Sequence, residues 1–113
     1  DVWRSGRVCG LRARGGFEIV RMEWDGGRLT RAVIRSTIGG NCRVRSSSAL
    51  RSCKGGGFRT AEGENPNPLF ALQRINPPVI APGASLHPVV LPTKYTYDIE
   101  TEAGRVYTLS FAE

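Results

Sequence analysis

The 113-residue sequence has no long hydrophobic run, because its apolar stretches reach only three or four residues, as in Val89 to Leu91. A membrane-spanning helix needs about 20 apolar residues, so the sequence excludes a membrane span. No window of about 11 residues repeats its apolar side chains at the helical period, so we expect little or no helix. The chain opens on Asp1 instead of Met, which we interpret as the start of a processed or excised segment.

Histidine and cysteine are scarce, with one histidine, His87, and three cysteines. An odd cysteine count argues against a complete disulfide framework, and the spacings match no metal-binding motif. We expect Cys9, Cys42 and Cys53 to be buried free thiols, with one disulfide as the alternative in an oxidising compartment. Because His87 lies in a proline-rich stretch, it is a poor base for a nucleophile, and we expect no metal and no cofactor.

Charge is plentiful and mostly positive, with 16 basic and 10 acidic residues and a net charge of +6. Such a surplus raises the hypothesis of a nucleic-acid partner. However, the arginines are scattered and mostly alternate with apolar residues, which is typical of solvent-facing strand positions. We therefore expect no nucleic-acid partner, and interpret the charge as a solvated face or as an interface with an acidic neighbour.

Fourteen glycines and seven prolines punctuate the chain, so the elements between them are expected to be short. Residues 17–36 predict a hairpin that turns at Asp25-Gly26-Gly27, and a shift of apolar parity near Ile19-Val20 predicts a β-bulge. We also predict a strand over 41–45, short strands joined by loops over 46–68, an extended connector over 77–92 and a second hairpin over 95–111. This pattern predicts an all-β, jelly-roll-like antiparallel β-sandwich with little or no helix.

Paired carboxylates could hydrolyse a glycosidic bond, and the candidate pairs are Glu18 with Glu23, Glu62 with Glu64, and Asp98 with Glu100. A general acid needs an apolar setting that raises its pKa. The last pair is predicted to lie on the polar face of a strand, and the middle pair flanks a loop glycine. We therefore assign no catalytic residue. In the glycine-rich stretch at 9–17, Arg12 and Arg14 could pair with carboxylates of a neighbouring domain or a ligand, and we favour the domain.

Four phrases resemble the C-terminal β-domain of glycoside hydrolase family 95, which contains α-L-fucosidases and related α-L-galactosidases. They are GLRARGGFE (10–18), MEWDGGRL (22–29), GGNCRVR (39–45) and GENPNPL (63–69). The resemblance is good over residues 6–69 and weaker over 70–113, where only the final predicted hairpin fits. It implies that residues 1–113 form one β-sandwich domain excised from a larger glycoside hydrolase.

The resemblance also implies a role. Family members carry a helical (α/α)6 barrel whose residues perform inverting hydrolysis of a terminal α-linked fucosyl or galactosyl residue, and no position here matches that motif. The chain would then be a non-catalytic accessory domain, with the catalytic domain of the same polypeptide as partner and a periplasmic or extracellular location. The candidates for that contact are Arg12, Arg14, Phe17 and Asn41. The alternative is an autonomous module that binds an oligosaccharide by stacking on Trp3 and Trp24.

Overall fold

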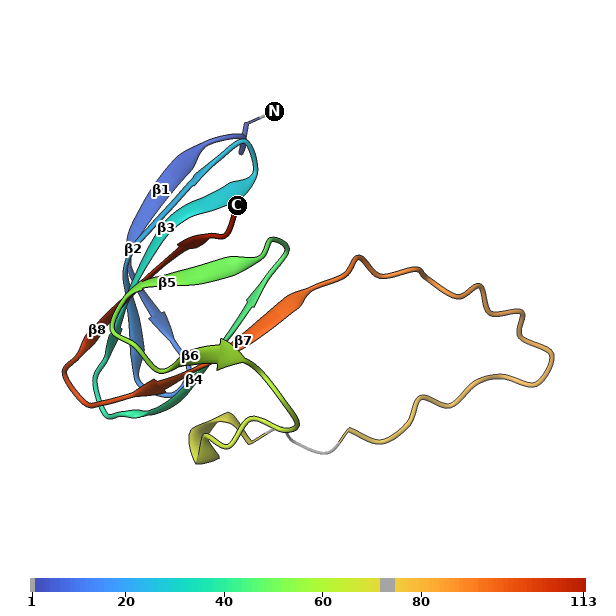
Figure 1. Ribbon diagram of the computed structural model, residues 1–113. Coiled ribbons are helices and arrows are strands. Elements are labelled where there is room, and N and C mark those ends of the chain that lie inside the picture. The colour runs from blue at the N-terminus through green and yellow to red at the C-terminus, as the bar shows by residue number, and fades with distance from the viewer. Residues whose placement is uncertain (1, 72–74) are drawn as a thin grey trace.

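The structure is a computed structural model that describes residues 2–71 and 75–113. Within them the elements are β1 (Gly6–Ala13), β2 (Phe17–Asp25), β3 (Arg28–Ser36), β4 (Gly40–Ser46), β5 (Leu50–Lys54), β6 (Phe58–Thr60), the 3-10 turn η1 (Pro68–Phe70), β7 (Tyr95–Thr101) and β8 (Val106–Phe111). A five-stranded antiparallel sheet has the order β1-β2-β3-β8-β5, and a three-stranded one has the order β4-β7-β6 (Figure 1). The predicted all-β antiparallel sandwich is confirmed. In the described part of the chain, no helix has the length and apolarity that crossing a membrane requires.

The hydrophobic core is made of residues from both sheets. Ile34, Tyr107 and Leu109 come from the five-stranded sheet, and Tyr97 and Ile99 come from the three-stranded one, and all of them are buried. Burying an apolar side chain of this size contributes roughly 1.5–3 kcal/mol. Alternate residues of a strand point to opposite faces, so one apolar residue in two is enough to build this core.

The first predicted hairpin is confirmed as β2 and β3. Ile19 and Arg21 pair with successive residues of β3, which leaves Val20 as the extra residue of the predicted bulge. Gly26 and Gly27 have φ values of 56° and 75°, the left-handed values that a tight hairpin turn requires. The predicted strand over 41–45 is β4, and the short strands expected over 46–68 are β5 and β6.

The second predicted hairpin is wrong, although both of its strands form. β7 pairs with β4 and β6 in the small sheet, whereas β8 pairs with β3 and β5 in the large sheet. Their link crosses between the sheets, where Gly104 N donates a hydrogen bond to Ser36 O at 2.7 Å. Alternating polarity predicts a strand but not its neighbour, because a hairpin and a link between sheets present the same local pattern. The sequence reading also missed β1, whose strand pattern is interrupted by Gly10.

The segment between η1 and β7 leaves the sandwich as a long excursion (Figure 1). As predicted for 77–92, it forms no strand. Its prolines explain this, since proline has no backbone N–H to offer a neighbouring strand.

Candidate functional site

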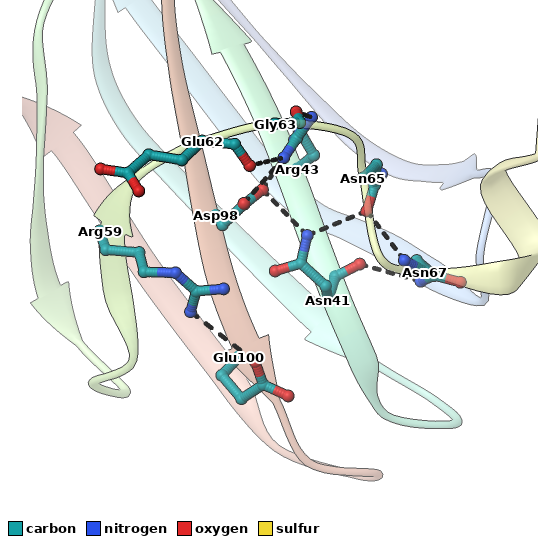
Figure 2. A network of polar contacts seen from close by, with 9 residues as sticks. All are labelled: Asn41, Arg43, Arg59, Glu62, Gly63, Asn65, Asn67, Asp98 and Glu100. Atoms are coloured by element: carbon teal, nitrogen blue, oxygen red, sulfur yellow. Dashed lines mark hydrogen bonds and ion pairs between the residues drawn. The ribbon is translucent and has the colours of Figure 1, made fainter.

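The most elaborate polar cluster lies on the outer face of the three-stranded sheet, where β4 and β7 pair. Arg43 is directly opposite Asp98 in the register. Arg43 Nε donates to Asp98 Oδ1 at 2.8 Å and Arg43 Nη2 donates to Asp98 Oδ2 at 3.0 Å, so the ion pair is bidentate. Asn41 Nδ2 adds a third hydrogen bond to Asp98 at 2.9 Å (Figure 2). Three donors compensate this carboxylate for the water it has lost.

The loop between β6 and η1 closes over this ion pair (Figure 2). Arg43 Nη1 donates to Gly63 O at 2.8 Å, and Asn41 Nδ2 also donates to Asn65 Oδ1 at 3.0 Å. Asn67 Nδ2 donates to Asn41 O at 2.9 Å. These contacts attach the loop to β4. We call the set of side chains the polar network, and it consists of Asn41, Arg43, Asn65, Asn67 and Asp98.

Burial of Asp98 corrects the expectation that it lies on a solvated face, because the residue is only 2% exposed. The loop over 61–67 covers it. Asn65 Oδ1 accepts from Asn67 N at 3.1 Å, and Asn67 Oδ1 accepts from Leu69 N at 3.0 Å, which caps η1 ahead of Pro68. The repeated Asn-Pro pairs are a turn and cap signal that sequence reasoning could have used further. The partnership of Arg43 with Asp98 leaves no such local signal.

The protonation states of the polar network follow from these contacts. The hydrogen bond from Arg43 lowers the pKa of Asp98, and the one from Asn41 lowers it further, against the opposing effect of burial. The same ion pair raises the pKa of Arg43. A glycosidase general acid needs a raised carboxyl pKa instead. Both groups therefore stay charged at neutral pH, and their role is to hold the loop on the sheet.

The other carboxylates considered for catalysis sit beside arginines. Their ion pairs are Glu18 with Arg35 at 3.2 Å, Glu23 with Arg21, and Glu100 with Arg59 at 3.7 Å. Glu62 contributes its backbone O, which accepts a bond from Arg43 Nη2 at 3.4 Å. These settings differ from the apolar pocket that a general acid requires.

All three cysteines are free. Cys42 is buried, and burial, with a smaller effect of nearby Asp98, raises the pKa of its thiol to about 11. The prediction of buried thiols is wrong for Cys9 and Cys53, which are exposed because they lie on β1 and β5, the two edge strands of the large sheet. Among the residues that the structure describes, no group of three or more His, Cys, Asp or Glu side chains is placed to hold a metal ion.

An apolar cavity of about 300 Å³ adjoins the polar network. Asn41, Asn65 and Asn67 form part of its lining, and Arg14 and Phe70 lie at the same cavity. The Arg14 guanidinium carbon lies 5.7 Å from the centroid of the Phe70 ring, within the range of a cation–π contact. The apolar part of its wall comes from both sheets and includes Ile19, Met22, Leu29, Ile34 and Val44. Such a wall suits an aliphatic or aromatic group better than a sugar.

The structure brings together three of the four predicted domain-contact residues. Arg14, Phe17 and Asn41 all line the apolar cavity, with Arg14 exposed and the other two buried in this domain. Arg12 lies on β1, and its exposed guanidinium is 3.9 Å from the Glu18 carboxylate. The docking role of these four residues stays a prediction.

The two tryptophans nominated for sugar stacking meet in space. The Trp3 and Trp24 rings stack with centroids 6.2 Å apart and an interplanar angle of 27°. Trp24 Nε1 donates to Trp3 O at 2.9 Å, which fixes the chain ahead of β1. Trp3 is 74% exposed. The pair therefore presents indole surface to solvent, while its binding role stays a prediction.

Comparison with known protein families agrees with the resemblance in the sequence. The family model described as glycoside hydrolase family 95, C-terminal domain, matches residues 1–73, more than half of the chain. The match spans β1 to β6 and η1, and it includes four members of the polar network, whereas Asp98 lies beyond it. A search of curated proteins found no match. The chain thus belongs to glycoside hydrolase family 95, and residues 1–73 match the C-terminal domain of that family.

Proposed function

We propose that residues 1–113 form a non-catalytic accessory domain that packs against the catalytic domain of the same polypeptide. A family 95 C-terminal domain implies a catalytic domain in the same chain. The observation that carries the proposal is the state of Asp98, whose pKa is lowered by its bidentate ion pair with Arg43. Hydrolysis of a glycosidic bond needs a carboxyl group tuned in the opposite direction. The best-placed carboxylate of this domain therefore serves its architecture.

We infer that the parent protein is an α-L-fucosidase-like enzyme that removes a terminal α-linked fucosyl or galactosyl residue. The family membership and the four sequence phrases support this inference. We further propose a periplasmic or extracellular location, because such an enzyme meets its oligosaccharides there.

The charge of the domain supports docking on an acidic neighbour. The net charge is +6, and the side chain of Arg12 is 75% exposed at the end of β1. Arg14, one turn further, lines the apolar cavity. Guanidinium groups bind carboxylates through two parallel hydrogen bonds, which makes arginine well suited to interfaces between domains. We therefore place the contact at the end of β1 and the mouth of the cavity.

Deleting this domain from the full-length hydrolase tests the accessory role. We expect a lower yield of folded enzyme and a lower melting temperature, and we expect the isolated 113-residue chain to release no sugar from fucosylated substrates. Changing Arg12→Gln and Arg14→Gln together should reproduce part of the loss. The matched control is Arg28→Gln with Arg31→Gln, two exposed arginines towards the other end of the sheet. Unchanged stability after deletion, or hydrolysis by the isolated chain, would refute the proposal.

The stacked tryptophans favour a second candidate, in which the domain binds an oligosaccharide on its own. Sugar rings stack on exposed aromatic faces, and Trp3 and Trp24 form such a surface. Titration of the isolated chain with fucosylated oligosaccharides should then give millimolar or tighter binding. Trp3→Ala should abolish the signal, while Tyr95→Ala, another exposed aromatic, should preserve it. No binding at millimolar sugar would remove this candidate.

A further inference from the structure

Residues 75–93, which we call the apolar arm, differ in composition from the rest of the chain. None of these 19 residues is charged, so all 16 basic and 10 acidic residues lie elsewhere. The arm contains five prolines and seven large aliphatic residues, and these aliphatic residues are Ile75, Val79, Ile80, Leu86, Val89, Val90 and Leu91. Flexible linkers and disordered segments are polar or charged instead. The composition of the arm is that of a segment that becomes buried.

The structure nevertheless leaves the apolar arm in solvent. Its seven aliphatic residues are between 55% and 99% exposed, and Figure 1 shows the arm projecting from the sandwich. The radius of gyration is 16.9 Å, compared with about 13 Å expected for a compact domain of this length. Exposed apolar surface on this scale marks an interaction site.

The prolines of the arm make it a suitable segment to bind in an extended form. Each proline fixes φ near −65° and removes a backbone donor. Less backbone freedom in the unbound arm means a smaller entropy loss on binding. The missing donors also oppose pairing of the arm with the strand edges of other molecules.

Both ends of the apolar arm are rooted on the three-stranded sheet. The polar network holds the loop that precedes η1, and Phe70, the last residue of η1, lines the apolar cavity. At the other end, β7 begins at Tyr95, which pairs with Ser46 of β4. The arm therefore starts beside the face at which we place the domain contact. A partner docked on that face would be within its reach.

We propose that the apolar arm lies extended on an apolar surface of the catalytic domain of the same polypeptide. This inference rests on the proposed function. A domain in the same chain meets the arm at an effective concentration on the order of millimolar, which a second copy of the chain does not reach in dilute solution. The absence of charge from the arm also fits a permanent interface, whose centre is depleted of charged residues.

Hydrogen–deuterium exchange, compared between the full-length hydrolase and the isolated 113-residue chain, tests this placement. We expect amides of residues 75–93 to exchange at least about tenfold more slowly in the full-length protein, as expected for a segment held at a buried interface. Combining Val79→Ser, Val90→Ser and Leu91→Ser should restore fast exchange in the full-length protein. The matched control, Asn76→Ala with Ser85→Ala and Thr93→Ala, keeps the aliphatic residues and should stay protected. All of these positions are exposed, so the variants keep the fold.

The same data separate failure of this inference from failure of the proposed function. Equal exchange of the arm in both proteins, with β1 protected only in the full-length protein, would overturn the arm contact and leave the domain contact in place. Equal exchange of both segments would overturn the accessory role as well. An isolated chain that dimerises at micromolar concentration and protects the arm in that dimer would assign the arm to a second copy, and this would also overturn the proposal.

Discussion

Replacing Asp98 by Asn is expected to destabilise the domain strongly. The amide keeps the size of the side chain, but it removes the negative charge and turns an NH₂ group toward the donors of Arg43 and Asn41. Removing one partner of a buried ion pair costs about 3–5 kcal/mol. We expect about 3 kcal/mol, the lower end of that range, because Arg43 keeps the carbonyls of Glu62 and Gly63 as acceptors.

The assay is urea and thermal unfolding of the 113-residue chain, followed by circular dichroism and tryptophan fluorescence. For a domain of this size, 3 kcal/mol corresponds to a fall in melting temperature of about 12 °C. Glu100→Gln is the control, because its ion pair with Arg59 on the same strand is exposed and should change the unfolding free energy by less than about 0.5 kcal/mol. A loss for Asp98→Asn below about 1 kcal/mol, well under the range for a buried ion pair, would refute the view that the polar network clamps the loop.

The pH dependence gives an independent check. The pKa of Asp98 is lowered in the folded state, whereas the unfolded value is about 3.9. The stabilising contribution of the ionised group is therefore complete above about pH 5 and is lost as the pH falls through the folded-state pKa. The difference in unfolding free energy between the wild type and Asp98→Asn should narrow below about pH 4. A constant difference down to acid unfolding would contradict the assignment of the lowered pKa.

Two further predictions concern the core and the thiols. Leu109→Ala empties a position that is 1% exposed, and chemical denaturation should show a loss of about 3 kcal/mol; an unchanged midpoint would mean that the core does not depend on this side chain. At pH 8 a thiol reagent should label the exposed Cys9 and Cys53 in the folded protein, whereas Cys42, buried and with its pKa raised to about 11, should react only after unfolding. Equal labelling rates for the three thiols would contradict the burial of Cys42.

The sequence by itself determined the strands, one turn and the family. Alternating polarity marked β2, β3, β4, β7 and β8, because a strand with one face in the core must alternate. The bulge at Val20 followed from the change of parity, and the first turn followed from Gly26 and Gly27. These features depend on neighbours in the chain, so local reasoning reaches them. The order of four short phrases carried the resemblance that the family match later agreed with.

Only the tertiary structure decided which strands pair and which polar side chains are buried. β7 turned away from β8 to lie between β4 and β6, and a loop distant in sequence then covered Asp98. Arg43 and Asp98 are 55 positions apart, and Trp3 and Trp24 are 21 apart. Local patterns carry no record of such partners, because pairing and burial depend on how the sheets pack as a whole.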